Sequence, residues 1–235
     1  VYKDSDAHAQ LGIFGAASKI AMIMSMITQA FRYAYEPFVF GKSRDKDNKE
    51  TYARAMKFFL IFTILAFLVV MGYMDVLRHI IGRDYWVGLR VVPIVMAGGI
   101  MTGVYFNLSF WYKLIDKTIW GAYFSGIGCA VIIGINVIFV PHYGYMACAW
   151  AGFLGNATAM VLSYVVGQRK YPIDYPLKSI LVYVLIGGFF FAIITYCNAN
   201  LSVPEALGVN TLVIIAFIAH VIYHDMPQVI RKFKK

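Results

Sequence analysis

The chain has 235 residues, of which 60% are hydrophobic and 14% charged, and its mean hydropathy is +0.67. This composition lies far outside the range of soluble domains and predicts an integral membrane protein. The net charge of +9 could also indicate a protein that binds nucleic acid. The placement of the basic residues along the chain decides between these two classes.

Charge-poor stretches recur along the chain, each close to the ~20 residues that cross a ~30 Å hydrocarbon core as an α-helix. Runs of this length do not suit transmembrane β-strands, which need only ~10 residues with polar and apolar side chains alternating. The sequence therefore predicts an all-α polytopic membrane protein with seven transmembrane helices. The stretches are 12–31, 58–74, 91–111, 120–140, 146–167, 180–196 and 207–223.

The basic residues alternate between the loops that join these stretches. Most of them fall in 41–57, 112–118, 168–178 and the C-terminal tail, whereas the intervening loops carry few. By the positive-inside rule, the C-terminus and these basic loops are cytoplasmic, and Val1 starts on the outer side. The basic excess is thus a topology signal, and we expect no nucleic-acid partner. Because the chain starts at Val1 with a polar segment that lacks a signal-peptide core, we also expect a fragment of a longer protein.

Polar side chains share one narrow face of the first predicted helix, continued to residue 36. At 100° per residue, every member lies within about 40° of the direction of Ser18 around the helix. A charge that faces lipid costs at least ~2.5 kcal/mol, so this stripe must face protein or water. We expect it to line a water-filled substrate cavity; the alternative is a structural ion pair, since Arg32 and Glu36 are four residues apart. The stripe comprises Ser18, Ser25, Gln29, Arg32 and Glu36, flanked by Lys19.

Small residues repeat at every fourth position in the third, fourth and fifth stretches. Such ridges let helix backbones approach closely, so we expect them to pack helices rather than to bind a ligand. Asn136 and Asn156 are expected to form interhelical hydrogen bonds that contribute ~0.6–2 kcal/mol each. The expected packing residues are Gly99, Gly103 and Asn107 in the third stretch, Gly126 and Gly134 in the fourth, and Gly155 in the fifth.

The second stretch and the last two stretches are almost uniformly apolar, which predicts lipid-exposed positions at the edge of the bundle. Motifs of membrane enzymes and of ATP-driven pumps are missing: the sequence has no Walker loop, no GxGxxG and no HExxH. His220 and His224 stand at helical spacing beside Asp225, but no further clear ligand accompanies them. We therefore expect no enzymatic activity, no cofactor and no metal.

The residues of the third to fifth stretches resemble a known family. The run 103–113 (GVYFNLSFWYK) is followed by Asp116-Lys117-Thr118, and Asn136 precedes the run 140–150 (VPHYGYMACAW). These residues resemble the C-terminal half of Wzx-type polysaccharide flippases. That family exports O-antigen and capsule units and belongs to the multidrug/oligosaccharidyl-lipid/polysaccharide (MOP) exporter superfamily. The likeness covers residues 11–175.

The resemblance implies the C-terminal part of a fourteen-helix MOP-type flippase. Residues 1–167 would form five helices of its C-terminal lobe, and 168–235 a cytoplasmic loop, two peripheral helices and a basic tail. The implied function is to flip undecaprenyl-diphosphate-linked oligosaccharide from the cytoplasmic to the periplasmic leaflet of the bacterial inner membrane, for cell-surface polysaccharide biosynthesis. The implied partners are this lipid-linked oligosaccharide, the lipid bilayer, the N-terminal half of the same protein, and a polysaccharide polymerase and chain-length regulator.

A cationic cavity suits this cargo, because a diphosphate that crosses a low-dielectric slab needs compensating positive charge and Arg offers bidentate contacts. Arg32 and Lys19 are the first candidates for this role, and Arg90, near the outer mouth, is the third. Glu36 would tether Arg32 or take part in ion coupling. The residues expected to hydrogen-bond sugar hydroxyls are Gln29 and Ser25.

Two alternatives stay open. The first is a multidrug/cation antiporter of the same superfamily, although such proteins usually carry intramembrane acidic residues and the deep charges here are mainly basic. The second is a structural membrane subunit of a polysaccharide-assembly complex, with Arg32 and Glu36 as a packing pair. The length of the stripe disfavours the second, because packing needs one pair rather than five aligned polar residues.

Overall fold

The computed structural model describes residues 4–41 and 48–225, and every regular element in these two segments is a helix. Seven helical runs of this described part are long and apolar enough to cross a membrane, which confirms the predicted all-α polytopic membrane protein. Val1, the basic residues at 42–46 and the basic tail from Gln228 lie outside the described residues. The elements are α1 (Asp4–Gly41), α2 (Asn48–Gly72), α3 (Met74–Leu77), η1 (Arg78–Ile80), η2 (Arg83–Val91), α4 (Val92–Leu108), α5 (Phe110–Leu114), α6 (Ile119–Tyr143), α7 (Tyr145–Lys170), α8 (Leu177–Asn200) and α9 (Val203–Asp225).

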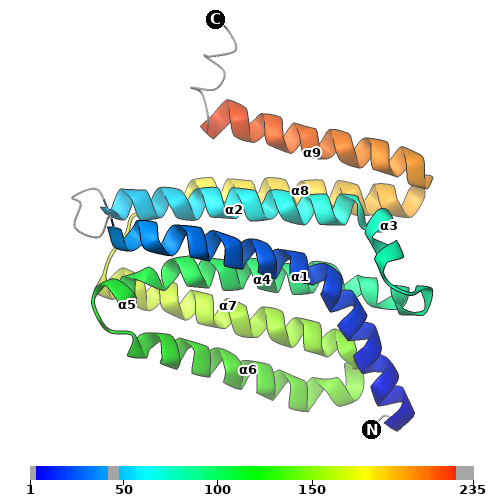
Figure 1. Ribbon diagram of the computed structural model, residues 1–235, viewed down its shortest axis with the longest axis horizontal. Helices are drawn as coiled ribbons and strands as arrows, with labels where there is room; N and C mark the ends of the chain where they lie inside the picture. Colours follow the sequence, from blue (N-terminus) through cyan, green and yellow to red (C-terminus); the bar gives the residue numbers. More distant parts are fainter. Residues whose placement is uncertain (1–3, 42–47, 226–235) are drawn as a thin grey trace, which may run out of the picture.

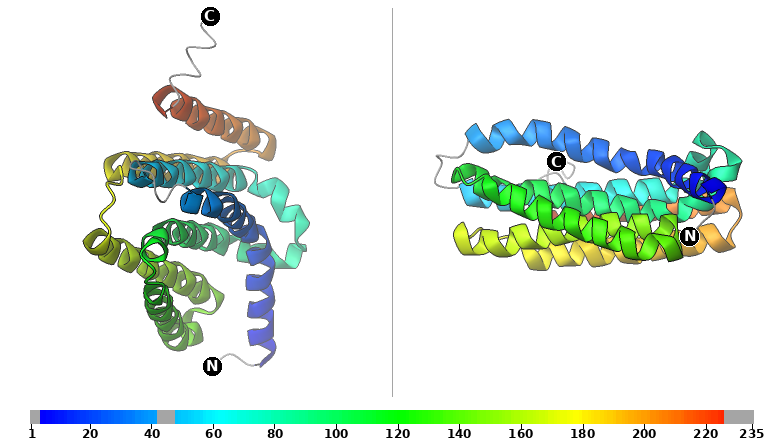
Figure 2. Two further views of the ribbon diagram at one scale, coloured as in Figure 1. Left: turned by 60° about the vertical axis from the view of Figure 1, so that its left-hand side comes forward. Right: turned by 90° about the horizontal axis from the view of Figure 1, so that it is seen from below.

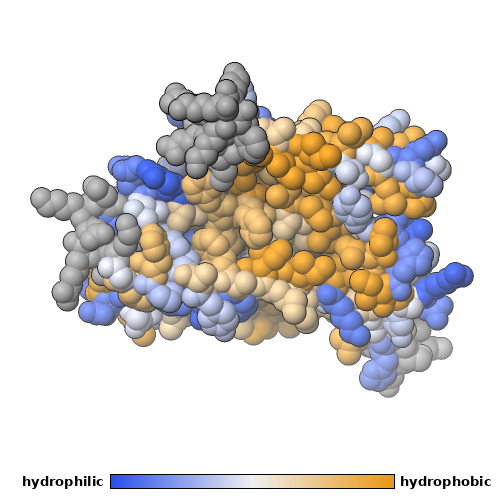
Figure 3. All heavy atoms as spheres, turned by 45° about the horizontal axis from the view of Figure 1, so that its top comes forward, coloured by the Kyte–Doolittle hydropathy of each residue, from blue (hydrophilic) through white to orange (hydrophobic). Residues whose placement is uncertain are grey.

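The long helices run side by side (Figure 1), and apolar side chains form a belt between two more polar ends (Figure 3). Each of the seven runs has at least 23 residues, which at ~1.5 Å per residue exceeds the ~30 Å of a hydrocarbon core. The third crossing combines η2, α4 and α5 into one run, Arg83–Leu114. The belt and the helix lengths together place the bundle across a bilayer.

One end of the bundle carries most of the described Lys and Arg residues, and we call it the basic end. The helices α1, α7 and α9 end there, α2 and α8 begin there, and α5 leads into α6 there (Figure 1). The opposite end holds α3, η1 and η2. The basic loops, which alternate along the sequence, thus gather at one end of the bundle. The cytoplasmic location of this end stays a prediction.

The helix α2 lies inside the bundle, so the prediction of a lipid-exposed edge helix was wrong for it. In the most hydrophobic stretch of α2, 56% of the residues are buried, compared with 22% in the corresponding stretch of α8 and 28% in that of α9. It packs against α1, α4, α8 and α9. The physical reason is that uniform apolarity shows only that a helix has no polar face, and such a helix suits a protein interior as well as lipid.

Small residues let α1, α2, α4, α6 and α7 approach closely. A Cβ atom on Gly99 of α4 would lie 2.9 Å from Met24 Cγ of α1, and a Cβ atom on Gly103 would overlap the ring of Phe59 of α2. A Cβ atom on Gly155 of α7 would lie 2.8 Å from a carbonyl oxygen of α6. The small residues that α7 buries are Ala147, Ala149, Ala151, Gly155, Ala159, Ser163 and Gly167.

Gly126 and Gly134 of α6 do not pack against another helix of the described chain, contrary to expectation. A Cβ atom at either position would meet no atom within 4 Å. The helix uses Gly128 instead, where a Cβ atom would lie 2.9 Å from the carbonyl oxygen of Gly155. A four-residue repeat identifies a ridge of small residues, but it does not reveal which ridge faces the bundle.

The three asparagines expected to support packing behave differently from one another. Asn156 Nδ2 donates across helices to the Gly98 carbonyl oxygen at 3.5 Å. Asn107 is buried, but its Nδ2 donates within α4 to the Gly103 carbonyl oxygen at 3.0 Å. Asn136 Oδ1 is buried and accepts no hydrogen bond from the described residues, so the expected interhelical bond is missing there.

The contact between α6 and α7 predicts that Gly155→Leu destabilises the protein. The added side chain would overlap Ile132 and approach the backbone of Gly128, and overpacking of this kind costs ~1–3 kcal/mol. Thermal unfolding in detergent measures the effect. Gly126→Leu is the matched control, because its side chain would enter open space, and it should change stability by no more than ~0.5 kcal/mol. Equal effects of the two changes would contradict the observed packing.

Candidate functional site

The polar stripe of helix α1 runs along the border between the buried and the exposed side of the helix. Its inward residues Ala17 and Met24 are fully buried, whereas Lys19, Ser25 and Gln29 are exposed. The two views of Figure 2 place α1 along one face of the bundle, and the right-hand view places α8 on the opposite face. The stripe therefore borders an open surface of the described chain, which we call the α1 polar face. Its members are Lys19, Ser25, Gln29, Arg32 and Glu36.

Near the basic end of α1, the carboxylate of Glu36 lies between two cations. Lys113 Nζ of α5 donates to Glu36 Oε1 at 2.5 Å, and Arg32 Nε lies 3.5 Å from Glu36 Oε2. All three side chains are partly buried, with exposed fractions of 27–35%. Because two positive charges share one negative charge, the Arg32–Glu36–Lys113 cluster keeps an excess of positive charge at the edge of the α1 polar face.

The surroundings of Arg32 combine an aromatic ring with polar atoms. Its guanidinium lies over the Phe106 ring of α4, with Cζ 4.9 Å from the ring centroid. On its inner side a cavity of about 10 Å³ is bordered by Thr28, Tyr35 and Asn107. The Thr28 hydroxyl, the Tyr35 hydroxyl and Asn107 Oδ1 are buried and form no hydrogen bond within the described part of the chain. Buried polar atoms nearly always form hydrogen bonds. Three such atoms without a partner beside Arg32 therefore indicate a polar site rather than an ion pair whose hydrogen bonds are all formed.

A larger hollow of about 250 Å³ lies beside Phe106, between α4, α6 and α7. The Tyr105 hydroxyl of α4 and Ser125 Oγ of α6 lie 3.1 Å apart at its wall. Because Phe106 borders both this hollow and the small cavity at Arg32, the two spaces adjoin. The polar residues that line the hollow are Thr102, Tyr105, Ser125 and Asn156.

The structure does not bring all the expected cavity residues together. Lys19 precedes Arg32 by 13 residues, or ~20 Å along the helix axis. Arg90 is exposed at the end of η2, and the whole of α4 separates it from the Arg32–Glu36–Lys113 cluster. Ser18 is half-buried, and its hydroxyl has no hydrogen-bond partner among the described residues. Of the expected charged residues, Arg32 and Glu36 meet, and Lys19 and Arg90 stand apart from them.

Sequence reasoning missed Lys113 as a member of the site. It counted as one of the basic residues that set the topology, and it stands 77 residues away from Glu36. No pattern in the sequence links α1 to α5, so this contact becomes visible only in the folded chain.

A second buried polar cluster connects the peripheral helices to α2. Asp225, the last residue of α9, forms an ion pair with Lys57 of α2 and accepts a hydrogen bond from the Tyr183 hydroxyl of α8. The exposed fractions of the Lys57 and Asp225 side chains are 16% and 9%. His224, which has an exposed fraction of 65%, lies 3.9 Å from the same carboxylate. This cluster joins three helices at the basic end. Its role is explained by the attachment of α8 and α9 to α2.

Comparisons of the chain with protein-family models, with curated proteins and with solved structures found no match. The chain is a multi-pass all-α membrane protein, one of whose crossing helices presents a polar, net cationic face on the outside of the described bundle.

The contact between α1 and α5 predicts that Glu36 and Lys113 are energetically coupled. A double-mutant cycle with Glu36→Gln and Lys113→Gln should give a coupling free energy of ~0.5–3 kcal/mol, because Glu36→Gln leaves the partly buried Lys113 without its partner and Lys113→Gln leaves Glu36 with Arg32 alone. Thermal unfolding in detergent measures it. The control is the exposed pair Glu50 and Arg54, for which ~0.3–0.5 kcal/mol is expected. A coupling no larger than that of the control would argue against the cluster.

Proposed function

We propose that this chain is the cavity-lining C-terminal half of a flippase for lipid-linked oligosaccharides. Its cargo is an undecaprenyl-diphosphate-linked oligosaccharide, which moves from the cytoplasmic to the periplasmic leaflet of the bacterial inner membrane for cell-surface polysaccharide biosynthesis. The C-terminus and the basic end face the cytoplasm in this proposal. The observation that carries it is the α1 polar face, exposed on a membrane-crossing helix.

The charge of the site suits a diphosphate. Lys113 and Arg32 together carry one positive charge more than Glu36 neutralises. An anionic headgroup that enters the low-dielectric zone needs such compensation, and the planar guanidinium of Arg32 can contact two phosphate oxygens at once. Glu36 holds both cations in place until the diphosphate arrives and competes with it afterwards.

The neighbouring hollow suits the glycan. Its hydroxyl and amide groups are those that hydrogen-bond sugar hydroxyls, and the rings of Tyr105 and Phe106 offer apolar contact. On α1, Gln29 and Ser25 extend the same polar surface away from Arg32. Headgroup and sugar would thus bind side by side, with the diphosphate at the basic end of the site.

The open surface also implies a covering partner. A polar face on a crossing helix is stable only where protein or water covers it, because lipid cannot satisfy its hydrogen bonds. In this proposal an N-terminal half of seven further helices faces α1 and encloses the water-filled cavity. Rocking of the two halves would expose the site to each side of the membrane in turn.

Arg32→Ala and Arg32→Glu in the full-length protein test the proposal. Both should lower export by at least ~10-fold, because a hydrogen bond to a charged group contributes ~1.5–3 kcal/mol. The measurement is the amount and the leaflet distribution of the undecaprenyl-diphosphate-linked oligosaccharide in cells that carry only the variant. The complete repeat unit should accumulate on the cytoplasmic side.

Arg54→Ala is the matched control, because Arg54 is also a helical Arg paired with an acidic residue four positions away, but it lies exposed outside the site. It should export normally. Normal export by both Arg32 variants, inserted at normal levels, would mean that the α1 polar face is structural. An unchanged lipid-linked pool combined with altered sensitivity to cationic drugs would favour the antiporter.

A further inference from the structure

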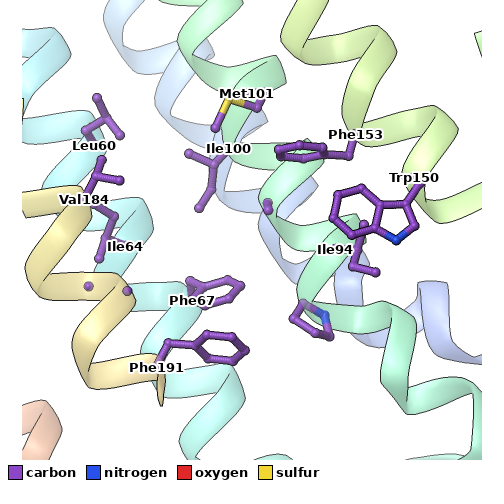
Figure 4. A pocket seen from close by; sticks show the side chains of 14 residues that line it. Leu60, Ile64, Phe67, Ile94, Ile100, Met101, Trp150, Phe153, Val184 and Phe191 are labelled. Carbon is purple, nitrogen blue, oxygen red and sulfur yellow. The ribbon is translucent and has the colours of Figure 1, made fainter. Parts of the chain in front are cut away.

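An apolar groove runs between α7 and α8, on the face of the bundle opposite to α1 (Figure 2). Two adjoining cavities of about 420 and 280 Å³ form it and have three lining residues in common. Figure 4 shows the larger cavity, into which Phe67 of α2 and Phe191 of α8 point, with Trp150 and Phe153 of α7 across from them. No lining residue of this larger cavity carries a charge, a hydroxyl or an amide side chain. We call this feature the α7–α8 groove.

Two adjacent glycines of α8 create the groove. A Cβ atom on Gly187 would lie 2.6 Å from Ile64 Cγ2, so glycine is needed there for α8 to approach α2. A Cβ atom on Gly188 would meet no atom within 4 Å, so the absence of a side chain there leaves open space. The close approach of α8 to α2 at Gly187 and the missing side chain at Gly188 thus shape this side of the hollow.

The groove runs lengthwise along the helices. Its lining extends from Tyr164 to Trp150 on α7 and from Leu177 to Phe191 on α8. Both intervals are 14 residues, or ~21 Å along a helix, which is more than half of a ~30 Å hydrocarbon core. An apolar groove of this length at membrane depth fits one extended hydrocarbon chain.

Cations flank the groove at the basic end. Arg169 and Lys170 end α7, Lys178 stands in the first turn of α8, and all three are exposed. The connection 171–176 between the two helices adds one acidic residue, Asp174. Burial raises the pKa of the Tyr175 hydroxyl, which lines this end of the groove and therefore stays neutral. The mouth of the groove keeps a net positive charge, which complements a phosphate group.

We propose that the α7–α8 groove binds an anionic glycerophospholipid, with one acyl chain between α7 and α8 and the phosphate at Arg169, Lys170 and Lys178. The groove supplies the chain contact, and the basic mouth selects the headgroup. This binding is separate from the candidate transport site, because α2 and α4 lie between the groove and α1. It therefore stands or fails independently of the glycan-flipping proposal.

Native mass spectrometry of the purified protein with added phosphatidylglycerol or phosphatidylcholine of the same acyl chains tests the headgroup. The protein should retain phosphatidylglycerol in preference. The double variant Arg169→Gln/Lys178→Gln should lower its retention by about fivefold for each charge removed. Lys117→Gln is the control, because Lys117 is an exposed cation at the same end but lies in the connection between α5 and α6.

A filled groove tests the chain contact. Gly188→Leu places a side chain in the open space and should abolish retention of both phospholipids. Gly208→Leu on α9 is matched to it, since that position is also open and gains the same helix propensity, and it should retain phosphatidylglycerol as the wild type does. Equal retention of the two phospholipids by the wild type, or unchanged phosphatidylglycerol retention in Gly188→Leu or in the double variant, overturns the proposal.

Discussion

Hydrocarbon offers no hydrogen bonds, so every polar side chain on a membrane-crossing helix needs protein or water beside it. The helix α1 concentrates this requirement, because it carries Arg32 and Glu36 together with exposed Ser25 and Gln29. The described helices satisfy it only in part: Lys113 and Arg32 reach Glu36, while Lys19, Ser25 and Gln29 stay exposed. The proposed cavity and its covering partner both follow from this single unmet requirement.

The packing of the bundle places the site. Gly99 and Gly103 let α1 and α2 approach α4, and this approach brings the Arg32 guanidinium over the Phe106 ring. The third crossing then continues through α5, which brings Lys113 to Glu36. Larger residues at the two glycines would move α1 outward and separate the charges, so close packing in the core determines the electrostatics at the surface.

Periodicity and composition predicted the seven crossings, because length and apolarity are local properties of a chain. They failed to predict which helix, or lipid, each residue faces, because this depends on contacts between helices that are distant in the sequence. The uniform apolarity of α2 could not separate a protein interior from lipid, and the small-residue ridge of α6 did not show that Gly128, rather than Gly126, faces α7. The helical wheel grouped Arg32 with Glu36, but Lys113 joins them only through the fold.

The proposed function requires that the α1 polar face contacts water at membrane depth. Ser25→Cys and Gln29→Cys, made in a protein whose native cysteines are replaced, can be labelled in membranes with a water-soluble maleimide. Leu212→Cys on α9 reports a lipid-facing position, since Leu212 has an exposed fraction of 66% in the apolar belt. We expect both α1 positions to react much faster than the Leu212 position. Labelling as slow as at that position would mean that lipid or packed protein covers the stripe, and would rule out a water-filled cavity beside α1.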